Sequence, residues 1–141
     1  MKRIILIGQG ASGKTFLAFN IAAAFDNVAY INGRDLKKQD HLFRYSSLNT
    51  ETDLLIIDDV FLNKLDLLQD IIYFDSLRIE KQSKAAVIIN LPTVIITIDT
   101  TEDEMLKDEH FNSMEHRCKF IVTSIEESER GKLFTHRLLK K

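Results

Sequence analysis

The residues with the clearest chemical signature are 8–16, GQGASGKTF, which directly follow the apolar run of residues 4–7. They fit the pattern G-x-x-x-x-G-K-[ST], with fixed positions at Gly8, Gly13, Lys14 and Thr15. Glycines let the backbone wrap around phosphate oxygens so that successive N–H groups point inward, and a helix that starts at the lysine adds its positive dipole end. The pattern therefore predicts a loop that binds the phosphates of a nucleotide. A glycine-rich turn from strand to helix with an incidental lysine is the alternative.

The expected ligand of this loop is ATP together with Mg²⁺. Lys14 can reach the β- and γ-phosphates, and the Thr15 hydroxyl can bind the metal ion. The residues expected to bind the nucleotide are Gly8, Gly10, Ala11, Ser12, Gly13, Lys14, Thr15 and Phe16.

A second anchor for the metal is offered by residues 54–59, LLIIDD, which read as an apolar strand that ends in two carboxylates. Asp58 is expected to hold Mg²⁺, mostly through water, beside Thr15. Asp59 follows directly and faces differently, so it can take a proton from the attacking water. The alternative is that both aspartates cap the following loop or helix.

Composition indicates one domain over residues 1–141, because 45% of the residues are hydrophobic and no linker interrupts the chain. The net charge of −2 gives no global attraction to nucleic acid, so any such contact must be local. No apolar run approaches the roughly 18–20 residues that span a bilayer, and no signal peptide opens the chain, so we expect a cytoplasmic protein without a membrane partner. The single cysteine, Cys118, excludes an intrachain disulfide and is expected to be a buried structural thiol.

The periodicity of apolar residues predicts alternating strands and helices. Strands are expected at residues 2–7, 28–31, 54–57, 93–98 and 119–123, and helices at 14–25, 62–74 and 101–109. A β-hairpin is expected at residues 77–80 and 86–90, a short helix and loop at 35–50, and a terminal helix at 131–141, where a contact for a partner or nucleic acid is the alternative. The expected fold class is α/β, a P-loop NTPase with a mostly parallel central sheet, helices on both faces and a β-hairpin insertion.

The order of these features resembles that of the superfamily three helicases, the replication ATPases of small DNA viruses and some plasmids. Residues 8–15 match the phosphate loop of that family, and residues 54–59 resemble its metal strand, including the doubled acid of the circular single-stranded-DNA virus branch. Residues 77–92 look like its hairpin motif, residues 94–99 like its sensor strand, and residues 115–122 like the segment in which an arginine precedes a last strand. AAA+ relatives share much of this plan.

The resemblance implies roles for three basic residues outside the loop. Lys81 and Lys84 on the hairpin would contact single-stranded DNA in a central channel, and Arg117 would complete the ATP site of a neighbouring subunit as an arginine finger. A solvated turn accounts for the two lysines equally well. For Arg117 the alternative is a surface arginine paired with Glu115 or with an acid of residues 102–109.

The end of the sensor strand departs from the family, which normally has an asparagine near the lytic water where this chain has Asp99. A carboxylate there repels phosphate unless it is protonated or paired, so we expect that hydrolysis is slow or that Thr97 takes the role. The chain also starts at the first strand, without the upstream oligomerisation helices and nickase domain of the family. This weakens the expectation of a stable ring and of origin recognition.

The function that the resemblance implies is a helicase or translocase ATPase in DNA replication, acting as a homo-oligomeric ring on single-stranded DNA, with a replication protein as a further partner. The alternative is an ATP-dependent switch or adaptor that hydrolyses weakly and recruits a protein. A nucleotide or metabolite kinase ranks third, because such kinases usually clamp a second substrate with arginines on a mobile lid and the arginines here are scattered.

Overall fold

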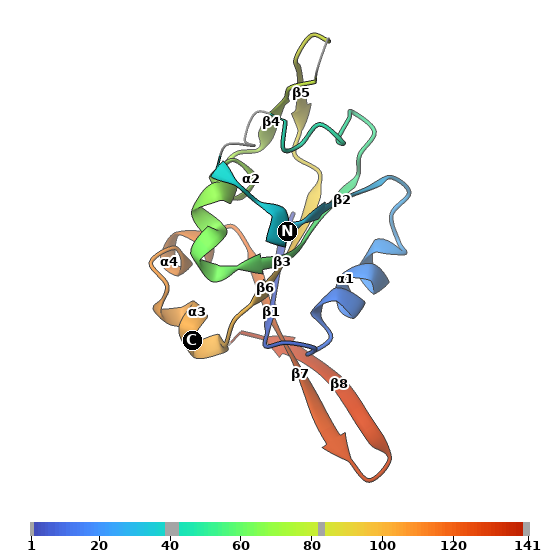
Figure 1. Cartoon of the computed structure of the whole chain (residues 1–141), viewed down its shortest axis with the longest axis vertical. Helices are drawn as coiled ribbons and strands as arrows, with labels where there is room; N and C mark the ends of the chain where they lie inside the picture. The colour runs from blue at the N-terminus through green and yellow to red at the C-terminus, as the bar shows by residue number, and fades with distance from the viewer. Residues whose placement is uncertain (1, 39–42, 82–83, 140–141) are drawn as a thin grey trace.

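The computed structural model describes residues 2–38, 43–81 and 84–139 (Figure 1). Within these residues, six strands form one sheet in the order β2-β3-β6-β1-β7-β8. They are β1 (Arg3–Gly8), β2 (Val28–Asn32), β3 (Leu54–Phe61), β6 (Thr93–Asp99), β7 (Lys119–Ser128) and β8 (Gly131–Leu138). The first five run parallel, and β8 is antiparallel to β7. The α/β class and the mostly parallel sheet are confirmed.

Helices cover both faces of this sheet (Figure 1). On one face lies α1 (Lys14–Ala22), and on the other lie η3 (Leu62–Leu68, a 3-10 helix), α2 (Gln69–Tyr73), α3 (Glu102–Lys107) and α4 (Phe111–Met114). Side chains alternate along a strand, so Ile5 and Ile7 join the larger apolar cluster under α2–α4, whereas Leu6 packs with Ala18 of α1. Strands buried on both sides are apolar almost throughout, which is why their sequences lack a polar alternation.

The helical segments differ in detail from those that periodicity predicted. Residues 62–74 begin as a 3-10 helix, and α-helical geometry starts only at Gln69. The acidic helix is α3, and the short helix α4 that follows it was not predicted. In the segment 35–50 the structure has η1 (Gly33–Asp35, a 3-10 helix) at its start, while residues 39–42 lie outside the described residues.

The predicted β-hairpin is present as β4 (Ser76–Ile79) and β5 (Val87–Asn90). The two strands pair antiparallel, with Leu77 opposite Ile89. The hairpin immediately precedes β6, so it projects from the edge of the sheet at which β6 begins (Figure 1).

The terminal helix expected at residues 131–141 is wrong, because Gly131–Leu138 is the strand β8. Strand β7 continues past residue 123 to Ser128, and its open edge offers backbone partners to the returning chain. Gly131 has φ 114°, which a glycine adopts without strain, at the start of the return. Two side-chain contacts then favour strand pairing over a separate amphipathic helix. Ser124 and Thr135 are hydrogen-bonded across the strands, and Arg137 forms an ion pair with Glu102 of α3.

Two further sequence expectations concern burial and membranes. Cys118 is 3% exposed, as predicted, and burial raises the pKa of its thiol to about 11. Across the part of the chain that the structure describes, no helix has the length and apolar character needed to cross a membrane.

Candidate functional site

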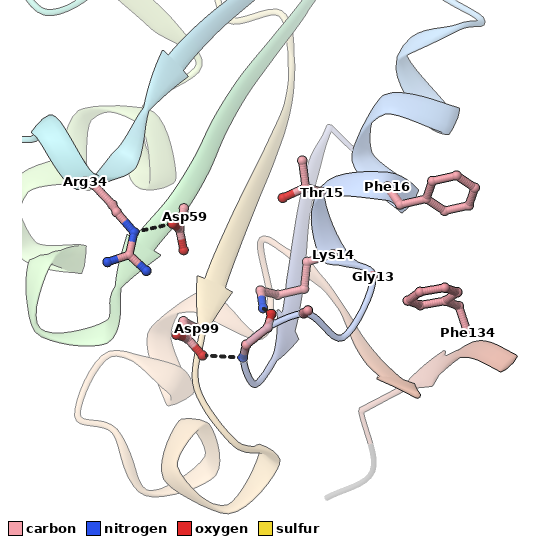
Figure 2. Close-up of a pocket in the computed structure, with 10 residues that line it drawn as sticks. Gly13, Lys14, Thr15, Phe16, Arg34, Asp59, Asp99 and Phe134 are labelled. Carbon is pink, nitrogen blue, oxygen red and sulfur yellow. Dashed lines mark hydrogen bonds and ion pairs between the residues drawn. The ribbon is translucent and has the colours of Figure 1, made fainter. Parts of the chain in front are cut away.

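A cavity of about 450 Å³ opens where β1, β3 and β6 end, at the carboxyl edge of the sheet (Figure 2). Ligands of open α/β sheets commonly bind at this edge. The cavity is lined by Gly10, Ala11, Gly13, Lys14, Thr15, Phe16, Arg34, Asp59, Asp99 and Phe134. The structure thus brings most of the sequence-predicted site residues together from three separate segments.

The loop between β1 and α1 needs its glycines. Gly10 and Gly13 have φ of 50° and 93°, which are left-handed conformations that residues with a Cβ rarely adopt. A Cβ on Gly8 would lie 2.2 Å from Ser12 Oγ and 2.5 Å from Thr123 Oγ1, so this glycine is required for close packing. No side chain caps the amino end of α1, which leaves its first N–H groups available to an anion.

The Lys14 ammonium lies inside the loop rather than in solvent. Its Nζ donates hydrogen bonds to the carbonyl oxygens of Gly8 at 2.8 Å and Gly10 at 2.9 Å. Burial lowers the pKa of Lys14, and the nearby carboxylates of Asp99, Asp59 and Asp58 oppose that shift. The ammonium is therefore held at the bottom of the cavity by neutral oxygens and surrounded by negative charge.

Asp58 links the β1–α1 loop to the central strands. The Thr15 hydroxyl donates to both carboxylate oxygens of Asp58, at 3.1 and 3.2 Å, and the buried Thr97 hydroxyl donates to one of them at 2.6 Å. Tyr30 Oη donates from β2 at 3.3 Å, and burial together with the Asp58 charge raises the pKa of this phenol, so it stays a donor. Asp58 is thus held at the side of Thr15 and does not cap the next helix.

This donor set fits a magnesium ion. Mg²⁺ prefers oxygen ligands, uses one or two protein groups and keeps the rest of its shell for water and phosphate. A hydroxyl and a carboxylate about 3 Å apart meet that need, and a cation would replace the hydrogen bond that joins them. Among the described residues there is no cluster of three or more His, Cys, Asp or Glu side chains suited to a metal.

Asp59 has a backbone conformation that points to function. Its φ is 65°, and the pairing of β3 with β6 shifts register between Ile57 and Val60, so the two aspartates lie in an irregularity of the strand. The Asp59 N–H donates to Thr97 Oγ1 at 2.6 Å, which fixes the turn. Asp58 and Asp59 consequently face different surroundings, as their sequence position suggested.

Arg34 is a cavity residue that the sequence reasoning missed. It belongs to η1, directly after β2, and its guanidinium forms an ion pair with the Asp59 carboxylate (Figure 2). The guanidinium also lies over the Phe61 ring, 4.7 Å from the centroid. The local sequence does not mark this arginine, because it reaches Asp59 through the parallel pairing of β2 with β3, which brings the ends of the two strands to one edge of the sheet.

Asp99 lies at the end of β6, opposite the loop. Its carboxylate accepts a hydrogen bond from the Gly10 N–H at 3.0 Å (Figure 2). The carboxylate is therefore hydrogen-bonded to the loop, and it engages the N–H of Gly10.

Three predicted residues lie away from this cavity. Arg117 precedes β7, at the opposite edge of the sheet, where it donates to the Tyr73 carbonyl at 3.3 Å and its guanidinium lies 5.6 Å from the Tyr73 ring centroid. Lys81 and Lys84 lie at the end of the β4–β5 hairpin and border a separate cavity of about 310 Å³. Within one chain, none of the three reaches the Lys14 site.

No known protein-family model matches the chain, and no curated protein matches its sequence significantly.

Proposed function

We propose that this chain is a P-loop ATPase that binds Mg·ATP in the cavity above the β1–α1 loop and hydrolyses it. The observation that carries the proposal is the contact of the Thr15 hydroxyl with the Asp58 carboxylate, directly beside the buried Lys14 ammonium. These three groups supply an ammonium for phosphate and oxygen ligands for magnesium within one small volume. An incidental glycine turn does not account for a buried lysine that is followed by a hydroxyl bonded to a carboxylate of another strand.

In the proposed cycle the loop amides and Lys14 bind the β- and γ-phosphates, and the phosphate displaces Asp99 from the Gly10 N–H. Thr15 and Asp58 would hold Mg²⁺, which would supply positive charge against the charge that develops on the phosphate oxygens. Arg34 exchanges Asp59 for the γ-phosphate, which frees the Asp59 carboxylate. Asp59 then accepts a proton from a water molecule as its oxygen bonds to the γ-phosphorus, and the bond to the β-phosphate oxygen breaks to leave ADP.

The basic experiment measures phosphate release from Mg·ATP by the wild-type chain and by Lys14→Ala. Lys64→Ala is the matched control, because Lys64 is an exposed lysine on η3, outside the cavity. We expect turnover by the wild type and by the control, and none by Lys14→Ala. Equal turnover by all three proteins, or none by the wild type over long incubation, would contradict the proposal.

We further propose that the ATPase acts on single-stranded DNA as a ring, in the manner of the superfamily three helicases, and therefore in the cytoplasm. The β4–β5 hairpin favours this function, because it carries Lys81 and Lys84 at its end and projects from the sheet (Figure 1). Phosphate contacts by a few lysines from each of several subunits would overcome the lack of a global positive charge.

A DNA titration tests this part. We expect single-stranded DNA to stimulate phosphate release, the double variant Lys81→Ala/Lys84→Ala to lose the stimulation but keep basal turnover, and the native mass in ATP to be that of a ring. Arg117→Ala should lower turnover only where a ring forms, because Arg117 lies far from the cavity of its own chain. Turnover that ignores DNA, from a protein that stays monomeric in ATP, would rule out the translocase.

A switch or adaptor with weak hydrolysis is the second candidate function. Two contacts favour it, because Asp99 is bonded to the Gly10 N–H and Asp59 is paired with Arg34, so both carboxylates are engaged before a nucleotide arrives. Slow, DNA-independent turnover together with an ATP-dependent protein partner would select this function over the translocase.

A further inference from the structure

Two aromatic side chains lie together at the end of the cavity away from Arg34 and Asp59 (Figure 2). Phe16 of α1 and Phe134 of β8 stack with ring centroids 6.1 Å apart and planes at 29°. The two residues are 65% and 50% exposed. Each ring thus keeps an open face that a planar ligand can reach.

A second cavity, of about 180 Å³, adjoins the first at these rings. The two cavities share Gly13, Phe16 and Phe134. The smaller one is also bordered by Asn20, one turn after Phe16 on α1, and by His136, which lies two residues after Phe134 and so on the same face of β8. An amide and an imidazole beside exposed rings combine hydrogen-bonding groups with a stacking surface.

We infer that Phe16, Phe134 and the smaller cavity bind the nucleobase of the nucleotide, an inference that rests on the proposed function. In the proposed function the terminal phosphates and the metal lie at one end of the cavity, beside Thr15, Asp58, Asp59 and Arg34. The base is at the other end of a nucleoside triphosphate, so it leaves the cavity on the side of the aromatic pair. Base–aromatic stacking is a strong and common means of holding a base there.

The distance between the rings decides how the base stacks. A base inserted between two rings needs them about 7 Å apart, twice the optimal carbon–carbon separation. The rings are 6.1 Å apart, so the base stacks on an outer face of the pair. Every base has such a face, and stacking alone therefore discriminates weakly between ATP and GTP.

The test compares Mg·ATP with Mg·tripolyphosphate, which has the phosphates but no base, by titration calorimetry. We expect the wild type to bind ATP more tightly, and Phe134→Ala to lose about 10-fold in ATP affinity while its tripolyphosphate affinity is unchanged. Leu133→Ala is the matched control, because Leu133 is a similarly exposed neighbour on the opposite face of β8. A thermal melt of each variant verifies that it is folded.

The outcomes separate the two proposals. If the wild type binds neither ligand, the proposed function fails and the inference fails with it. If it binds ATP and Phe134→Ala binds ATP equally well, the inference alone is overturned.

A second variant keeps the stacking surface and reports on it. The chain contains no tryptophan, so Phe134→Trp introduces a single indole fluorophore. We expect Mg·ATP to change its emission strongly, Mg·tripolyphosphate to change it little, and the ATP affinity to stay near that of the wild type. Identical responses to the two ligands would contradict a base at this position.

Discussion

Asp99 provides the sharpest test of the proposed phosphate site, because its carboxylate accepts a hydrogen bond from the Gly10 N–H, a donor that the proposal gives to the nucleotide. Asp99 accepts a hydrogen bond from the Gly10 N–H at 3.0 Å, and its charge opposes the lowering of the Lys14 pKa that burial causes. An incoming phosphate must break the hydrogen bond and then tolerate the displaced negative charge. The substitution Asp99→Asn removes the charge but keeps an oxygen that can accept the same bond.

The expected size of the effect follows from two contributions. Like charges about 4–6 Å apart interact by roughly 3–4 kcal/mol at an effective dielectric constant near 20, and an open, hydrated cavity reduces this value substantially. The charged hydrogen bond to Gly10 exceeds a neutral one by about 1 kcal/mol. Lys14 loses part of its local stabilisation in the variant, which offsets some of the gain. We therefore expect ATP to bind more tightly by about 1–2 kcal/mol, or about 5- to 30-fold.

The assay is calorimetric titration of Mg·ATP at two salt concentrations, accompanied by a measurement of turnover. Asp103→Asn is the matched control, since Asp103 is an exposed acid on α3 whose substitution changes the net charge equally. The gain at Asp99 should shrink at high salt, the control should bind as the wild type does, and turnover should rise if the carboxylate restrains hydrolysis. Weaker ATP binding by Asp99→Asn would refute this reasoning and would indicate that the carboxylate contacts the metal or its water.

Three further predictions address single residues. Arg34→Ala should lower turnover by about 10²- to 10³-fold with a smaller loss of ATP affinity, because in the proposed reaction the guanidinium stabilises charge in the transition state. Arg130→Ala, at the β7–β8 turn, is the control. Equal turnover by both variants would exclude Arg34 from the reaction. Burial lowers the pKa of Lys14 below 10.5, so ATP affinity should be full at lower pH and should fall as the pH rises through the lowered pKa. The stability of the free protein should instead increase with pH between the lowered pKa and 10.5, because in that range the unfolded chain binds more protons than the folded chain. Binding and thermal melting at a series of pH values check both trends. The Cys118 thiol, with its pKa raised to about 11, should react with a disulfide reagent slowly at pH 8 and rapidly after unfolding; fast labelling of the native chain would contradict its burial.

The strands of the sheet and the residues near the loop were largely predictable, because each depends on local sequence. Continuous apolar runs that end at glycine or aspartate indicated β1, β3 and β6, and the structure has strands there. The β4–β5 hairpin was predicted from two short β-prone stretches and is confirmed. The approach of Lys14, Thr15 and Asp58 was expected from the pattern, although no local property could supply the distances.

The errors share one cause. Residues 131–138 are basic and amphipathic, and their conformation depends on the open edge of β7, a partner that the tail sequence alone does not reveal. Arg34 was missed because an arginine after a turn has no local mark, and only the parallel pairing of β2 with β3 brings it to Asp59. Phe134 was missed for the same reason as the tail, since the register of β8 on β7 carries its ring to Gly13.

The order of residues along the chain predicted a phosphate-binding loop and the acids expected to serve it. These predictions need only short segments, because they depend on backbone freedom at glycine, helix polarity and the chemistry of lysine, hydroxyl and carboxylate. Tertiary structure alone established what surrounds that loop. It paired Asp99 with Gly10 and Arg34 with Asp59, placed Arg117 at the far edge of the sheet, and set an aromatic pair beside the cavity. The partners in these contacts are 25 to 118 positions apart in the chain. Only strand order and register, which arise from burial of the whole sheet, can bring such residues into contact.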